Sequence, residues 1–166
     1  MKHMKKVMLI LLAAAMVFIL TGCGAKPAEE PAAETAVPAE ESGKTLAERV
    51  EAIANDAGEL APFDADDLAD MAGIQAGDYT DFVFLQGDVM EGREILALQA
   101  ADEAAAEKLA GQMEKYLERR REENRNYAPK AFQELSEAKV GRKGLLLVMI
   151  SGGDAEAETA ALLSGE

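Results

Sequence analysis

The chain has 166 residues, with 17 basic against 31 acidic side chains and a formal net charge of −14 at pH 7. A surface this acidic repels phosphate backbones, which argues against a nucleic-acid partner. The only cysteine is Cys23 and the only histidine is His3, so the sequence after residue 23 excludes disulfides, cysteine–histidine and serine–histidine–aspartate catalysis, and cysteine- or histidine-bound zinc.

Residues 1–22 have the pattern of a cleaved bacterial signal peptide. A short basic head precedes an uncharged apolar run, residues 7–19, which is shorter than the roughly 20 residues of a membrane-spanning helix. The alternative interpretation is a signal anchor with an incidental cysteine. The run ends in four residues that resemble the lipobox of bacterial lipoproteins: Leu20, Thr21, Gly22 and Cys23.

The lipobox resemblance implies a cellular location for the protein. A peptidase would remove residues 1–22, and Cys23 would become the first residue of the mature chain, carrying diacylglycerol and further acyl chains such as palmitate. Because two or three acyl chains anchor a protein stably, we expect attachment to the extracytoplasmic face of the cell membrane.

Residues 23–44 are expected to form a disordered linker. The segment is rich in alanine and glutamate, contains Pro27, Pro31 and Pro38, and has almost no large apolar residue. Such a stretch buries too little surface to offset the entropy lost on ordering. The linker is therefore predicted to be a spacer, with a maximum reach on the order of 60 Å.

A single globular domain is predicted for residues 45–166. Its first part is expected to contain helices at residues 45–57 and 64–71, the second starting at Asp64 with Asp67 three residues later as in a capping box. Residues 79–86 and 93–100 are rich in β-forming residues, and the connector between them, with glycine at both ends, predicts an antiparallel hairpin.

The second half of this domain begins with the strongest helix signal, at residues 101–125. A further helix is expected from Pro129, a brief strand near Lys139 and Val140, an almost wholly apolar central strand at residues 145–151 and a terminal helix at residues 154–163. The fold class predicted is α+β, with one small antiparallel sheet of three to four strands and helices packed on one face.

From Tyr79 onward, the order and spacing of several modest features form a pattern: the segment Arg93–Leu98, Asp102, the run Arg119–Arg121, the segment Tyr127–Pro129, Leu135, Ala138 and the segment Gly144–Ser151. This pattern resembles an extracytoplasmic lipoprotein family of Gram-positive bacteria known as domain of unknown function 4358. The resemblance implies a membrane-anchored domain without an assigned activity, and it transfers no functional residues.

Two charged clusters are candidate sites. An acidic cluster, Asp64, Asp66, Asp67 and Asp70, contains calcium-type ligands, but Ala69 and Gln75 stand where an EF-hand loop needs glycine and glutamate, so helix capping is the preferred interpretation. A basic cluster is a possible partner-binding patch for an envelope protein or an anionic wall polymer, although interleaved glutamates favour an ion-paired helix face: Arg119, Arg120, Arg121 and Arg125.

These observations favour a non-enzymatic binding or interaction module of the cell envelope, anchored to the membrane through Cys23. No cofactor, metal or catalytic residue is predicted. The alternative is a small carboxylate-dependent envelope enzyme, for which two acids from different elements should face each other in a cleft with raised pKa values.

Overall fold

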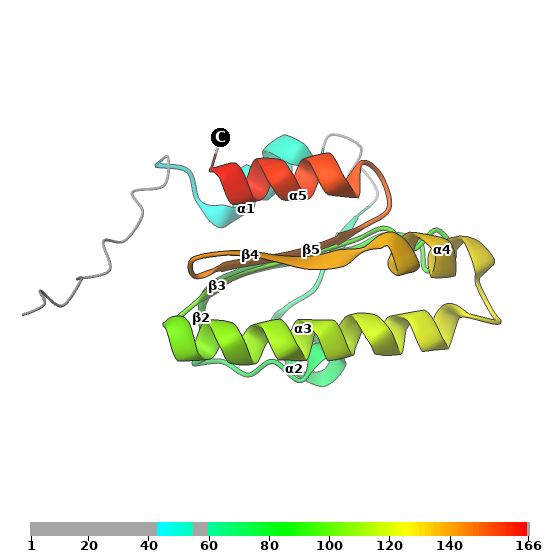
Figure 1. The fold of residues 1–166 in the computed structure, drawn as a ribbon, viewed down its shortest axis with the longest axis horizontal. Coiled ribbons are helices and arrows are strands. Elements are labelled where there is room, and N and C mark those ends of the chain that lie inside the picture. The colour runs from blue at the N-terminus through cyan, green and yellow to red at the C-terminus, as the bar shows by residue number, and fades with distance from the viewer. Residues whose placement is uncertain (1–42, 55–59, 166) are drawn as a thin grey trace, which may run out of the picture. The chain divides into compact units, whose positions relative to one another are not determined.

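The sheet of this protein has helices on both of its faces (Figure 1). The computed structural model describes residues 43–54 and 60–165, which belong to one compact unit, residues 38–166. Within these ranges no helix is long and apolar enough to cross a membrane. The elements in chain order are α1 (Leu46–Ile53), β1 (Ala61–Pro62), α2 (Ala65–Ala72), β2 (Tyr79–Gln86), β3 (Glu94–Ala100), α3 (Glu103–Asn124), α4 (Pro129–Glu137), β4 (Lys139–Lys143), β5 (Leu146–Ser151) and α5 (Ala155–Ser164).

The strands of the described ranges form one antiparallel sheet in the order β1-β2-β3-β5-β4. β2 and β3 pair as the predicted hairpin, with Phe84 opposite Leu96. β5 lies between β3 and β4, since Met149 is opposite Leu96 on one side and Val140 on the other. The prediction that residues 145–151 form an interior strand is therefore confirmed.

Side chains that alternate along β3 enter two separate cores. Leu96 and Leu98 pack on the side of α2, α3 and α4, against residues such as Leu109. Ile95 packs on the side of α1 and α5, against residues such as Leu162. Two apolar layers thus enclose the central strands.

The α+β class is confirmed, but two details of the prediction were wrong. The sheet has five strands in place of three or four, and helices cover both faces in place of one. The physical reason is the composition of β3 and β5, which are buried at almost every position. A strand that is apolar on both sides needs a cover on each face.

Helix starts lie where side chains supply acceptors for free backbone N–H groups. The Asp64 carboxylate accepts from the N–H groups of Asp66 at 2.9 Å and Asp67 at 3.0 Å, and the Asp67 carboxylate accepts from Asp64 N–H at 3.1 Å. The predicted capping box is thereby confirmed. Asp102 and Asp154 cap α3 and α5 in the same manner.

Two consecutive residues at the start of β3 tie the two helical layers to the sheet. The Arg93 guanidinium lies 2.8 Å from the Glu158 carboxylate of α5. The Glu94 carboxylate lies 3.3 Å from the Arg120 guanidinium of α3. Because neighbouring side chains on a strand point to opposite faces, this one end of β3 holds both α5 and α3.

Candidate functional site

One long edge of the sheet is open. β4 is its outermost strand, and no other strand of residues 43–54 and 60–165 lies on the outer side of β4 (Figure 1). At the opposite edge, β1 pairs only with Leu85 and Gln86 of β2, and Pro62 of β1 lacks a backbone N–H. On an edge strand, alternate backbone N–H and C=O groups point away from the sheet. The outer side of β4 therefore offers a partner backbone donors and acceptors that no strand of the described ranges pairs.

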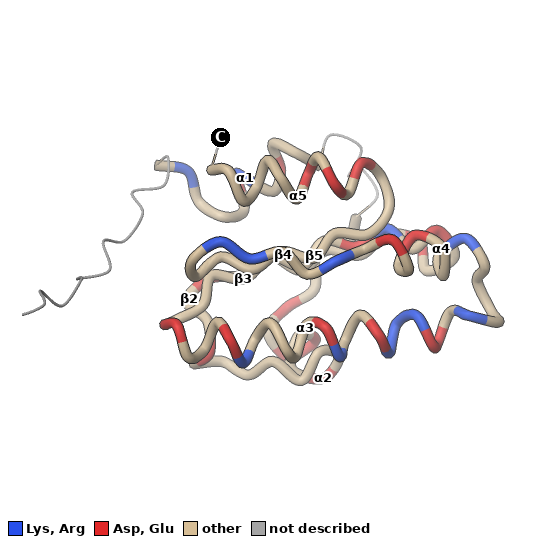
Figure 2. Tube along the Cα trace, viewed as in Figure 1, with Lys and Arg blue, Asp and Glu red and all other residues tan. Residues whose placement is uncertain are grey.

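The side chains of β4 form a basic strip on an acidic protein. The strand reads Lys-Val-Gly-Arg-Lys and has no acidic residue, and Figure 2 shows its cations at both ends of the strand. The Lys143 ammonium donates to the Ser164 carbonyl at 3.3 Å. The Arg142 guanidinium donates to the Gly144 carbonyl at 2.8 Å and pairs with Glu103 of α3. We call residues Lys139–Lys143 the β4 edge.

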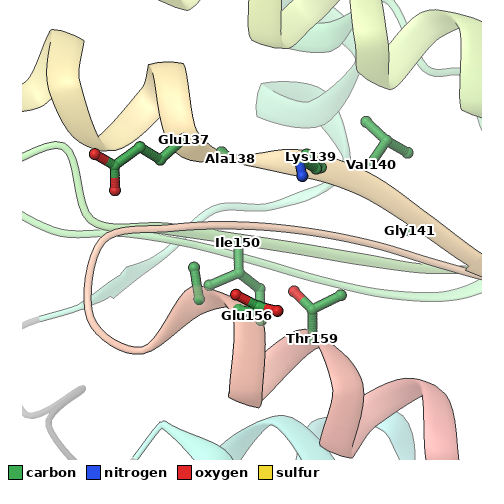
Figure 3. A pocket seen from close by; sticks show the side chains of 9 residues that line it. Glu137, Ala138, Lys139, Val140, Gly141, Ile150, Glu156 and Thr159 are labelled. Atoms are coloured by element: carbon green, nitrogen blue, oxygen red, sulfur yellow. The ribbon is translucent and has the colours of Figure 1, made fainter.

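A pocket of about 350 Å³ adjoins this edge on the α5 side (Figure 3). Ile150 of β5 and Thr159 of α5 line its inner part, between the strands and the helix. We call this the edge pocket, and its lining is Glu137, Ala138, Lys139, Val140, Gly141, Ile150, Ala155, Glu156 and Thr159.

Charges of both signs surround the edge pocket. The side chains of Lys139 and Glu156 form no hydrogen bond or ion pair within the described ranges, while the Glu137 carboxylate accepts from the Gln133 amide at 3.4 Å. The pocket lining thus includes one cation and two carboxylates. Ile150 adds an apolar surface to the wall, and Thr159 adds a hydroxyl group.

A second group of polar residues is buried between α3 and the sheet. We call it the Glu94 network: Gln86, Glu94, Tyr116 and Arg120. Gln86 and Glu94 are neighbours across β2 and β3, and Tyr116 and Arg120 reach them from α3. The Gln86 amide donates to the Tyr116 hydroxyl at 2.8 Å, and Arg120 Nε donates to Glu94 Oε2 at 3.3 Å. Glu94 Oε1 is buried without a hydrogen-bond partner in the described structure.

Burial controls the ionisation of the Glu94 network. It raises the pKa of the Glu94 carboxyl, although Tyr116, Arg120 and Gln86 act in the opposite direction. Burial and the adjacent Glu94 charge also raise the pKa of the Tyr116 phenol. Burial lowers the pKa of Arg120, but the charge and hydrogen bond of Glu94 together with the charges of Tyr116 and Glu123 outweigh it, so the net pKa is raised and Arg120 stays charged.

The chemistry of the network is that of an internal ion pair. Within residues 43–54 and 60–165, burial raises the pKa of the Glu94 carboxyl, and its charged neighbour is Arg120. The same ranges contain no cluster of three acidic, histidine or cysteine side chains that could hold a metal.

Comparison with known proteins adds one finding. Residues 53–152 match the family described as domain of unknown function DUF4358, which is more than half of the chain. The chain belongs to this family. No curated protein and no solved structure matches it.

The range matched by the family model ends between β5 and α5, two elements that both line the edge pocket. The matched range includes every strand of the described sheet and ends before α5. The β4 edge is therefore inside the family match. The edge pocket is only partly inside it, because α5 supplies Ala155, Glu156 and Thr159.

The four arginines of the predicted patch point to different partners within the DUF4358 domain. Arg120 pairs with Glu94. Arg121 donates to two backbone carbonyls at the end of α4, each at 2.8 Å. Arg119 donates to a backbone carbonyl of α2, and Arg125 pairs with the glutamate one turn earlier. Arg119 and Arg125 are about half exposed, so they are the two that a partner can reach.

Other predicted residues have simpler placements. Asp64 and Asp67 cap α2. Cys23 and the lipobox residues Leu20, Thr21 and Gly22 lie outside the described residues, as does the predicted linker as far as residue 42.

Sequence reasoning missed both the Glu94 network and the β4 edge. A sequence signal existed for the first, because Glu94 stands at the start of an otherwise apolar strand. For the β4 edge the signal was the three cations and no acid among residues 139–143, but its position at the rim depends on strand order.

Proposed function

We propose that this protein is a non-enzymatic binding module of the cell envelope, anchored through acyl chains on Cys23 to the extracytoplasmic face of the membrane. The single observation that carries the binding role is the β4 edge, whose outer side is paired with no strand of the described ranges and which lies beside a pocket. The apolar run followed by Leu20–Cys23 supports the address. Acyl chains at Cys23 would hold the domain near the bilayer without a basic membrane-binding surface, in keeping with its net charge of −14.

The polar groups of the Glu94 network support the same proposal, because they contact one another in the interior and leave recognition to groups on the surface. In the Glu94 network the carboxylate, amide, phenol and guanidinium groups contact one another under α3. Surface groups that can serve recognition lie at the rim of the sheet, where backbone hydrogen-bonding groups face outward. Strand edges of this kind bind extended chains by main-chain hydrogen bonds.

The lipid attachment at Cys23 and the membrane location are tested by a cysteine substitution. We expect the native protein to sediment with membranes and to have an intact mass above that of a chain starting at residue 23, by the mass of its acyl groups. Cys23→Ala is expected to appear unmodified in the soluble fraction, whereas Gly24→Ala, next to it, should behave as the wild type. An unacylated, freely secreted wild type contradicts the anchor.

The binding role is tested in the same cells with a photo-crosslinking amino acid. Placed at Arg142 on the β4 edge, it is expected to give a discrete adduct that the Cys23→Ala background loses. Placed at Lys115, an exposed position of α3, it should give none. Equal adducts from both positions, or none from either, contradict a binding role for the edge.

A further inference from the structure

We propose that the β4 edge binds an extended acidic peptide segment, which adds to the sheet as a sixth strand and places one side chain in the edge pocket. This inference rests on the proposed function and specifies the partner. It follows from the open backbone of β4, from the charges of the strand, and from the position of the pocket.

The first step is the backbone. β4 pairs with β5 from Lys139 opposite Ile150 to Lys143 opposite Leu146. Its other side has no strand next to it in the described ranges. Five residues in regular strand geometry span about 16 Å, which is long enough to pair with a short extended segment.

The second step is the choice of partner by charge. Natural proteins commonly place lysine on edge strands to prevent two copies from pairing. Here, antiparallel self-pairing centred on Gly141 would put Lys139 of one copy opposite Lys143 of the other, and parallel pairing in register would put each lysine opposite itself. Like charges directly opposite each other destabilise a sheet. The same cations attract a segment with acidic side chains, so the edge discriminates between a copy and an acidic partner.

The third step is the polarity along the strand. At one end of β4, the negative charges of Glu137 and Glu156 offset the positive charge of Lys139, because all three side chains line the same pocket. At the other end Lys143 has only the Ser164 carbonyl as a hydrogen-bond partner in the described structure. An acidic residue of the partner is therefore best placed opposite Lys143, and a neutral residue is best placed at the Lys139 end.

The fourth step is the pocket. Lys139, Gly141 and Lys143 occupy alternate positions and so lie on the α5 face of the sheet. α5 approaches closest at Gly141, where an added Cβ would lie 2.9 Å from Leu163 Cδ1 and 3.1 Å from Thr159 Cγ2. Room for a partner's side chain remains toward Lys139, where Figure 3 shows the pocket between β4 and α5. The apolar side chain of Ile150 and the hydroxyl group of Thr159 favour a small apolar or hydroxyl side chain there.

The test uses the mature chain from residue 23 with Cys23→Ala, labelled with ¹⁵N, and the blocked peptide acetyl-Glu-Glu-Val-Val-Thr-amide. Its reversed sequence samples the other strand direction. We expect saturable amide shift changes concentrated at residues 139–143 and at the pocket residues. A peptide with lysines in place of both glutamates, and one with N-methylated backbone amides, should each bind at least about fivefold more weakly, since they lose charge attraction and main-chain pairing respectively.

Matched variants locate the site. Lys143→Glu is expected to weaken peptide binding about fivefold to tenfold. Lys115→Glu makes the same change of charge on the exposed face of α3 and should leave the affinity within about twofold.

Several results would overturn the inference. Equal binding of the lysine peptide removes the charge argument, and equal binding of the N-methylated peptide removes strand addition. Shifts at β4 that grow with protein concentration alone would assign the edge to a second copy. A variant in which glutamine replaces Glu29, Glu30, Glu34, Glu40 and Glu41 tests the chain's own acidic segment. If its amide shifts at β4, measured without peptide, differ from those of the wild type, the β4 edge binds that segment. If the peptide fails while crosslinking at Arg142 succeeds, the binding module stands and the acidic-strand partner is wrong.

Discussion

The Glu94 network and the β4 edge are two charged regions of one sheet with opposite relations to solvent. In the network, Glu94 is 1% exposed and α3 covers it, so its contacts are with Gln86, Tyr116 and Arg120. On the edge, Lys139 and Lys143 are exposed and the strand lacks an outer neighbour in the described ranges. The comparison teaches that the buried Glu94 carboxyl packs against polar partners inside the fold, whereas the lysines of the β4 edge face solvent beside backbone groups that no strand of the described ranges pairs.

Arg120→Ala is the strongest way to break this comparison. It would leave the Glu94 carboxylate buried without its counter-charge, which costs roughly 3 kcal/mol of unfolding free energy. Arg120→Ala combined with Glu94→Gln should recover part of that loss, because the unpaired charge is gone. Urea denaturation of the four proteins in a double-mutant cycle measures both effects, and a loss below about 0.5 kcal/mol would show that the pair does not hold α3.

Gly92→Ala tests how tightly the loop before β3 packs. An added Cβ would lie 2.6 Å from the backbone of Ala131 in α4, and the residue has a φ of 74°, so we expect a loss of about 2 to 3 kcal/mol. Gly141→Ala is the control on the β4 edge. Its Cβ would come closer than 3.4 Å only to side-chain methyl groups of Leu163 and Thr159, so a shift of side chains relieves the contact and about 1 kcal/mol is expected. Thermal or urea unfolding of both variants gives the comparison, and equal losses would contradict it.

The smallest expected effect is a pH dependence. Burial raises the folded pKa of Glu94 above its ordinary value of 4.5, so the folded chain holds this proton more tightly than the unfolded chain does. The favourable contribution is complete below pH 4.5 and is lost as the pH rises through the folded pKa. Relative to Glu94→Gln, the wild type should therefore become less stable between pH 4.5 and about 7. Parallel urea titrations at the two pH values measure this difference, and a constant difference would mean that Glu94 titrates normally.

Local elements were the most predictable part of the fold. Asp64 and Asp67 determine the start of α2 through contacts within one helical turn, and Pro129 begins α4 as predicted. The hairpin of β2 and β3 also depends on nearby residues. β1 was not predicted, since its two residues become a strand only because they pair with Gln86 and Leu85.

The candidate sites were less predictable, for a related reason. The run Arg119–Arg121 is continuous in the sequence, but successive helical side chains point about 100° apart, so Arg119, Arg120 and Arg121 contact α2, the sheet and α4. Gln86 and Glu94 are eight positions apart and meet only through the register of the hairpin. Sequence spacing did not reveal either arrangement.

The sequence by itself determined the acidic character of the chain, the lipobox-like segment, the capping residues, the order of most helices and strands, and the α+β class, because these depend on composition or on neighbours within a few residues. Tertiary structure alone decided that helices cover both faces of the sheet, that Glu94 is buried beside Arg120, and that β4 lies at the rim next to a pocket. These properties depend on strand order and register, which bring together residues far apart in the chain.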